Sequence, residues 1–398
     1  MLTSLALIFL VGLSMASICK RFKVPRIIGM LATGIVLGPF VLNLFDESIL
    51  GISSELRQMA LVIILIKAGL ALDISDLRKV GRPAILMSFL PALAEIGGFV
   101  LFAPKLMGIT VLEAAIVGAV LGAVSPAVVV PKMVQLMDDK LGTDKKIPQL
   151  ILAGASLDDV FVIVLFSVFV EMEQGGEVAV MDFVGIPVSI VLGILLGAVA
   201  GLLVALFLEF EYKHGHKIRN SIKVLILLGI AFLLLECETL LTGIVPVSGL
   251  LAVMSMAVAY QMKSSKDVVK RISEKYGKVW IAAEAILFVL VGAAVDIRYT
   301  LEAGGMAILL IFIALIFRSV GVLICLIGTN LNFKERIFCV IAYIPKATVQ
   351  AAIGSVPLSL GLPCGKLVLS VAVLSIIITA PLGAFGMDLT DSKLLKQG

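Results

Sequence analysis

The chain has 398 residues, of which 60% are hydrophobic and 15% charged, and its formal net charge is +4. Its mean hydropathy of +1.15 is well above that of a soluble globular domain, so the composition excludes an ordinary soluble protein. The small basic excess comes from short loops and gives no indication of a nucleic-acid partner. The composition therefore predicts an all-α polytopic membrane protein.

Apolar runs long enough to cross a bilayer, about 17 to 25 residues, recur along the whole chain. The first run has no basic residue before it and is followed by Lys20 and Arg21, so we interpret it as a span and not as a cleaved signal peptide. About thirteen transmembrane helices are predicted, near residues 2–18, 26–42, 56–72, 83–103, 110–136, 147–171, 183–208, 222–237, 240–260, 279–296, 304–328, 336–356 and 366–386.

The basic residues between these spans alternate in density along the chain. With the N-terminus outside, 25 of the 32 Lys and Arg residues fall in inside segments, four fall outside and three lie within spans. Cytoplasmic loops of membrane proteins carry an excess of Lys and Arg. The charge pattern therefore predicts an outside N-terminus and a cytoplasmic C-terminus.

The fourth and fifth predicted spans each contain a feature that is unusual in lipid. Glu95 lies in the middle of the fourth span, where an unpaired carboxylate is costly. In the fifth span, Ser125 and Pro126 are followed by a second proline, Pro131. Because a proline removes a donor from the helix ladder, we expect an interrupted helix here, with freed carbonyls that must face protein or a cavity.

Two adjacent carboxylates, Asp158 and Asp159, lie inside the sixth predicted span. One aspartate at the centre of a membrane helix costs roughly 2.5–3.5 kcal/mol, so two in succession need a cationic partner, water, a proton or a bound cation. Successive helical residues point about 100° apart, so the two cannot face one partner in the same way. We expect one to contact a neighbouring cation and the other to face a cavity, which makes ion or proton handling the leading hypothesis.

An internal repeat relates the two halves of the chain. Residues 60–74 match residues 283–297 at an offset of 223, which pairs spans 2–6 with spans 9–13. Equivalent spans are seven apart, an odd number, so they cross the membrane in opposite directions, as in many secondary transporters. The same offset relates Glu95 to Arg318 in the eleventh span. We expect these two to form a buried ion pair near the repeat axis, as a static strut or in transport.

The twelfth span contains a second interruption, with Pro345 next to Lys346 and Thr348 close behind. It lies at the repeat position that corresponds to the first break. Where two interrupted helices cross, their ends supply dipoles, and Ser125, Thr348 and backbone carbonyls supply oxygen ligands. Lys346 supplies a cation at the same place. The two breaks together predict a transport site.

The repeat also predicts how the chain is divided. The parts are an N-terminal helix (1–20), a first inverted five-helix repeat (24–172), connecting helices (180–238), a second inverted five-helix repeat (240–386) and a short cytoplasmic tail (387–398).

Four motifs resemble the monovalent cation/proton antiporter superfamily, in its two-aspartate sodium/proton branch. They are residues 25–39, Ser125-Pro126, Leu157-Asp158-Asp159 and residues 344–354, which contain Pro-Lys-Ala-Thr-Val-Gln-Ala-Ala-Ile-Gly. The last is similar to the sodium/hydrogen exchanger-like group that also occurs in animals. The short termini suit a bacterial relative, in the plasma membrane.

The resemblance implies a role for each residue of the site. Asp159 would bind sodium, lithium or a proton, and Asp158 would pair with Lys346 when no ion is bound. Val124, Ser125 and Thr348 would contribute oxygens, although Val124 stands where relatives often have threonine. Spans 4–6 and 11–13 would form a moving core within membrane lipid, and the remaining spans a scaffold that forms a homodimer. The resemblance also implies that the N-terminal helix lies in the dimer or scaffold region. Neither an enzymatic activity nor a cofactor is implied.

Three other functions are consistent with part of the pattern. A potassium/proton antiporter would use the same carboxylates. A sodium-coupled organic-anion symporter of related fold would not need Lys346 opposite the two aspartates. An intramembrane aspartyl protease needs aspartates on facing helices, whereas Asp158 and Asp159 are adjacent on one helix.

A few polar residues receive no transport role from the sequence. The five cysteines lack C-x-x-C spacing, which indicates neither a zinc site nor a disulfide framework. His214 and His216 lie in a charged loop and are interpreted as solvated residues in preference to a pH sensor. Lys67 and Glu284 lie in apolar runs, and the sequence assigns no role to either.

Overall fold

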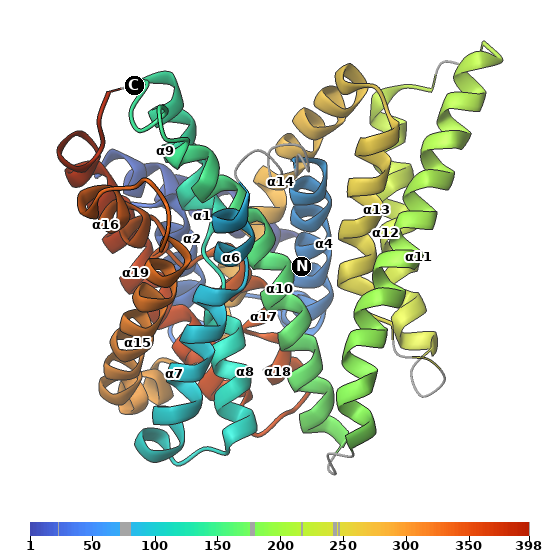
Figure 1. Cartoon of the computed structure of the whole chain (residues 1–398). Helices are drawn as coiled ribbons and strands as arrows, with labels where there is room; N and C mark the ends of the chain where they lie inside the picture. The colour runs from blue at the N-terminus through green and yellow to red at the C-terminus, as the bar shows by residue number, and fades with distance from the viewer. Residues whose placement is uncertain are drawn as a thin grey trace. The chain divides into compact units, whose positions relative to one another are not determined.

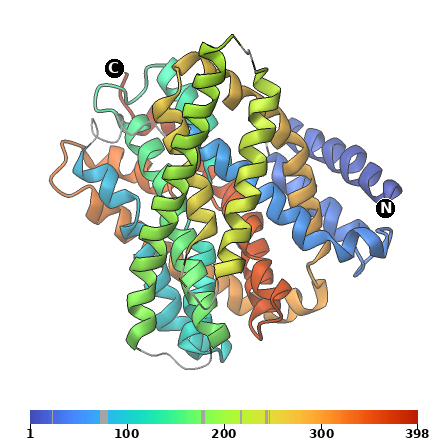
Figure 2. The same ribbon diagram turned by 90° about the vertical axis from the view of Figure 1, so that its right-hand side faces the viewer.

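The computed structural model describes residues 1–22, 24–71, 81–175, 180–215, 218–241, 245 and 247–397. Residues 72–74 of the repeat match and His216 lie outside this part, as do four of the counted loop cations, Lys23, Arg78, Lys79 and Lys217. The helices of the described residues (Figures 1 and 2) are α1 (Leu2–Arg21), α2 (Arg26–Leu37), α3 (Glu47–Gly51), α4 (Ser53–Ala71), α6 (Arg82–Met87), α7 (Leu90–Met107), α8 (Val111–Leu121), α9 (Pro126–Asp138), α10 (Ile147–Gly175), α11 (Val180–Lys213), α12 (Asn220–Leu241), α13 (Gly249–Lys263), α14 (Lys266–Ala293), α15 (Ile297–Cys325), α16 (Phe333–Ala342), α17 (Thr348–Ile353), α18 (Val356–Ser359) and α19 (Gly365–Leu394).

The helices have the length and composition of membrane spans. Within the described residues, seven are long and apolar enough to cross a bilayer, and shorter apolar helices lie at Arg26–Leu37, Val111–Leu121 and Val128–Met137. The prediction of an all-α membrane protein is therefore confirmed. The count of thirteen spans stays a prediction.

Three predicted spans are each formed by two helices. The fifth span consists of α8 and α9, and the twelfth of α16 and α17, as expected from their prolines. The fourth span is also divided, between α6 and α7, which the sequence did not predict. Pro91 lies in the first turn of α7, and because it has no N–H it cannot bond a carbonyl one turn earlier, as a helix continuing from α6 would require.

The prediction of a helix break at Pro131 is wrong. It lies inside α9, which continues from Pro126 to Asp138. A proline within a helix removes one ladder bond and bends the axis, but the neighbouring bonds can hold the helix together. Pro126, at the first position of α9, begins a helix where its missing N–H costs nothing. The interruption therefore lies before Pro126.

The chain forms two compact units. The first comprises Met1–Ser54, Asp73–Gln174 and Leu287–Gly398, and the second comprises Glu55–Leu72 and Gly175–Ile286. Both interrupted helices lie in the first unit. All the predicted ion-site residues therefore belong to one unit.

In the second unit, α11 packs along α13 (Figure 2). The contact is made by glycines at every fourth residue of α11, whose Cα atoms lie against backbone carbonyl groups of Ser248, Ala252 and Met256 with no room for a Cβ atom; these glycines are Gly193, Gly197 and Gly201. Small residues at this spacing let membrane helices approach closely. We conclude that α11 and α13 form a tightly packed pair.

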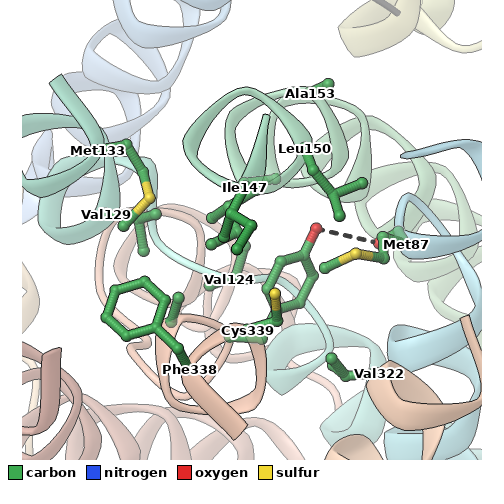
Figure 3. Packing of buried hydrophobic residues seen from close by; sticks show 14 of the residues in the cluster. Met87, Val124, Val129, Met133, Ile147, Leu150, Ala153, Val322, Phe338 and Cys339 are labelled. Atoms are coloured by element: carbon green, nitrogen blue, oxygen red, sulfur yellow. Dashed lines mark hydrogen bonds between the residues drawn. The ribbon is translucent and has the colours of Figure 1, made fainter. Parts of the chain in front are cut away.

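The first unit has a hydrophobic core built from α6, α9, α10, α15, α16 and α19 (Figure 3). Met87, Val129, Ile147 and Phe338 are fully buried within it. The core also contains Val124, from the segment between α8 and α9, so that one side of the first break is packed against apolar side chains. This packing holds the break in a defined position.

One end of the first unit is held by ionic and backbone bonds between α9 and the C-terminal segment. Lys132 Nζ lies 2.7 Å from carboxylate oxygens of both Asp388 and Asp391. The Gly142 N–H donates to the Lys396 carbonyl at 2.8 Å. α19 continues to Leu394, within the predicted tail at 387–398, and this end of the helix is tied to α9.

We expect Lys132→Met to destabilise the protein by about 1–3 kcal/mol, since it removes two charge-assisted hydrogen bonds from a nearly buried ammonium group. Thermal unfolding in detergent would measure this. Lys393→Met, a change at an exposed lysine on the same end of α19, is the control and should have little effect. Equal stability of both variants and the wild type would contradict a clamp at this position.

Candidate functional site

The first break begins where α8 ends. The Gly122 N–H bonds the Ala119 carbonyl, and the chain then leaves the helix until Pro126 starts α9. The last carbonyls of a helix have no partner within it, and they carry the negative end of the helix dipole. Buried in a membrane protein, these oxygens need donors from elsewhere in the fold.

Three side chains from the second repeat supply those donors. Lys346 Nζ bonds the Leu121 carbonyl at 2.5 Å, and Arg318 Nη1 bonds the Gly122 carbonyl. The Gln350 amide nitrogen bonds two further carbonyls, of Val120 at 3.2 Å and of Ala123 at 2.9 Å. Two cations and an amide therefore cap the negative end of α8.

The second break, between α16 and α17, is satisfied in a similar way. The Lys346 N–H donates to Thr379 Oγ1 on α19 at 2.9 Å, and the Ala347 N–H donates to Gln350 Oε1 at 2.7 Å. Thr379 and Gln350 are both fully buried. The unwound segment thus has defined partners for its backbone donors.

The two breaks also contact each other directly. The Ser125 N–H donates to the Pro345 carbonyl at 2.8 Å. The hydroxyl oxygens of Ser125 and Thr348, both buried, lie 3.5 Å apart and are 223 residues apart in sequence. A contact between repeat-equivalent residues is what a two-fold axis through this point requires. The predicted crossing of the broken helices is therefore present in the structure.

A network of buried charges surrounds the crossing. Arg318 Nη1 lies 2.9 Å from Glu95 Oε2, which is the predicted pair of repeat-equivalent residues. Arg318 Nη2 lies 2.8 Å from Asp158 Oδ2, which also accepts the Val124 N–H at 2.9 Å. Lys346 Nζ lies 2.6 Å from Glu95 Oε2. Two cations and two carboxylates thus form one connected group.

This network differs from the predicted pairing of Asp158 with Lys346. In the structure Asp158 bonds Arg318, and Lys346 bonds Glu95. The guanidinium group has several donors in a fixed fork, so it can serve two carboxylates and two carbonyls together. The lysine ammonium group bonds only Glu95 and the end of α8. Arg318 is therefore the bridging cation of the site.

Asp159 is the carboxylate that stands outside this network. It is 8% exposed, and its Oδ1 is buried without a hydrogen-bond partner. Within the described part of the chain no cation forms an ion pair with it. The structure does not place Ser125 or Thr348 in hydrogen-bond contact with Asp159. A buried carboxylate in this state favours binding of a cation or a proton.

Sequence reasoning missed three residues of the site. Gln350 and Thr379 hold the breaks, and their polar side chains inside apolar runs were the available signal. Tyr343 is the third: its carbonyl accepts Arg318 Nε at 2.7 Å, and its ring lies 5.4 Å from the guanidinium carbon. Its hydroxyl donates to the Met87 carbonyl at 3.4 Å, drawn as a dashed line in Figure 3.

Comparison with known proteins gives consistent matches over nearly the whole chain. The family described as "Sodium/hydrogen exchanger, transmembrane" matches residues 5–387. Sodium/hydrogen exchanger 9B2 of Xenopus tropicalis is 36% identical over 356 residues, which cover 87% of this chain and 64% of the relative. The human 9B2 protein is 33% identical over 385 residues, covering 94% of this chain and 70% of the relative. The chain thus spans about two thirds of the length of these relatives.

Two solved structures share the fold. The structure of the sodium proton antiporter MjNhaP1 from Methanocaldococcus jannaschii at pH 8 has a TM-score of 0.83 and 20% identity, and the match covers 99% of this chain and 98% of the other. A structure of the same antiporter from electron microscopy has a TM-score of 0.74 and 22% identity, covering 99% and 97% of the two chains. The helical arrangement is therefore that of a known membrane fold.

Proposed function

The chain belongs to the sodium/hydrogen exchanger family, and on that premise we propose that it exchanges sodium or lithium for protons at Asp159. The observation that carries this proposal is the buried Oδ1 of Asp159, which has no hydrogen-bond partner, beside four ionic groups that bond one another. A proton and a hard monovalent cation compete for such a carboxylate. Binding of one expels the other, and alternating access converts that competition into exchange.

The charge balance of the site supports an exchange of one cation for one proton. Glu95 and Asp158 offset the charges of Arg318 and Lys346, which leaves Asp159 as the uncompensated carboxylate. One sodium ion or one proton neutralises it. Because Lys346 is held by Glu95, we propose that it keeps its proton throughout the cycle and that transport moves no net charge.

Other parts of the site would support the cargo without carrying the charge. Ser125 and Thr348 lie at the crossing of the breaks, where their hydroxyl oxygens are suited to a sodium or lithium ion that leaves water. The Val124 N–H orients Asp158, so the contribution of this residue is a donor to the network. The cargo is a monovalent cation and a proton, and no resident cofactor is proposed.

The membrane setting of the protein completes the proposal. We propose that it is a homodimer in a cell membrane, as the family resemblance implies. The distribution of Lys and Arg supports an N-terminus outside and a C-terminus in the cytoplasm. The relatives named above are eukaryotic and the solved antiporter is archaeal.

The experiment that tests this function uses purified protein in liposomes with an internal pH dye. Sodium or lithium added outside should move protons, at a rate that stays the same when the membrane potential is clamped at 0 or at −100 mV. An exchange that moves a net charge would gain about 2.3 kcal/mol of driving force per 100 mV and would change its rate.

Other outcomes of the same assay point elsewhere. Proton movement driven by potassium but not by sodium would show that potassium is the transported cation and favour a potassium/proton antiporter. An exchange rate that depends strongly on the clamped potential would contradict the proposal that Lys346 keeps its proton throughout the cycle. Protein-free liposomes are the control for leakage.

A further inference from the structure

Besides the contact between Ser125 and Thr348, the uncharged side chain of Gln350 joins both broken helices. Its amide nitrogen donates to the carbonyls of Val120 and Ala123 after α8, and its amide oxygen accepts the N–H of Ala347 before α17. The side chain is fully buried. Three hydrogen bonds of one residue thus connect the first break with the second.

The positions that Gln350 holds are next to residues of the charge network. Ala123 precedes Val124, whose N–H donates to Asp158. Ala347 follows Lys346, which bonds Glu95 and the end of α8. A shift of either backbone position would therefore move one partner of a buried ion pair.

Gln350 has no counterpart in the first repeat. The residue 223 positions earlier is Ala127, which has no polar side chain. A link between the breaks from this position is therefore made by the second repeat alone. The charged residues are also divided unequally between the repeats. The second repeat supplies Arg318 and Lys346, and the first supplies Asp158 and Asp159.

We infer that Gln350 is a positioning residue, which keeps the two broken helices in the register that sets the affinity of the site for its cation. This inference rests on the proposed exchange at Asp159. Gln350 does not need to contact the cation. It acts through the backbone on either side, and its loss should weaken cation binding more than it slows turnover.

The test compares the wild type with Gln350→Met, which keeps the length of the side chain and loses all three hydrogen bonds. We expect the sodium KM of exchange to rise about tenfold and the maximal rate to stay within about threefold, because binding of the ion is weakened in the ground state and the transition state alike. Hydrogen–deuterium exchange at the Ala347 amide should become faster. Gln135→Met, at an exposed glutamine on α9, is the matched control and should change neither measurement.

Gln350→Glu is a second variant, which tests the hydrogen bond to Ala347 separately from the two hydrogen bonds to the end of α8. The carboxyl group can still accept the Ala347 N–H, but it loses both N–H donors to the end of α8. Here we expect slow deuterium exchange at Ala347 together with a raised sodium KM. This variant also keeps the test available if Gln350→Met fails to fold.

The outcomes separate the two proposals. A sodium KM within twofold of the wild type in folded Gln350 variants would overturn the positioning role while leaving the exchange function in place. Absence of exchange in the wild type would overturn the proposed function. In that case deuterium exchange still decides whether Gln350 holds the breaks, since unchanged protection of Ala347 in Gln350→Met would exclude it.

Discussion

Asp159→Asn is expected to abolish cation/proton exchange while leaving the protein folded. The amide keeps the shape of the side chain but removes the only carboxylate of the described ion site that the buried network leaves uncompensated. The variant can bind neither a proton nor a cation at this position in the pH range of transport. Exchange in liposomes should fall to the level of protein-free membranes.

Although Asp159→Asn should lose transport, we expect it to keep its stability. A buried carboxylate without a partner is costly, so Asp159→Asn should be no less stable than the wild type in the absence of sodium. Sodium should stabilise the wild type, by about 2.7 kcal/mol at 100 times its dissociation constant, and should not stabilise the variant. Asp139→Asn, at the exposed end of α9, is the control. Full exchange by Asp159→Asn would remove this residue from the mechanism.

Arg318→Met is expected to have the largest effect on stability. The guanidinium group is almost fully buried and bonds Glu95, Asp158 and the carbonyls of Tyr343 and Gly122. Removal of one partner of a buried ion pair costs roughly 3–5 kcal/mol, because the other charge stays buried. Unfolding in detergent would measure this loss, and exchange should be lost with it.

A double variant tests which buried carboxylate is left without an ion-pair partner when Arg318 is removed. Glu95 keeps Lys346 as a partner, whereas Asp158 loses its ion pair. Arg318→Met combined with Asp158→Asn should therefore be more stable than Arg318→Met alone. Arg271→Met, at an exposed arginine of α14, is the control. If instead the losses of stability from the two substitutions simply add, the ion pair with Arg318 is not what makes the buried Asp158 carboxylate tolerable.

Several features of the protein could be deduced from residue order. The apolar runs predict a helical membrane protein, and the motifs predict the exchanger family, both of which are confirmed. The offset of 223 leads from Glu95 to Arg318, and these residues form an ion pair in the structure. Repeat-equivalent residues near a two-fold axis must meet, so a sequence offset is enough to bring such a pair together.

The pairings across the axis could not be deduced in this way. Lys346 bonds Glu95 and not Asp158, and Gln350 joins the two breaks, because the crossing decides which donors reach the freed carbonyls of α8. Pro131 lies inside α9 and not at a break, since the helix continues past it on both sides. Residue spacing determines neighbours along one helix and across the repeat axis. Contacts between other helices depend on how the chain packs, which explains why the pairs Arg318–Asp158 and Lys346–Glu95 emerged only from the tertiary structure.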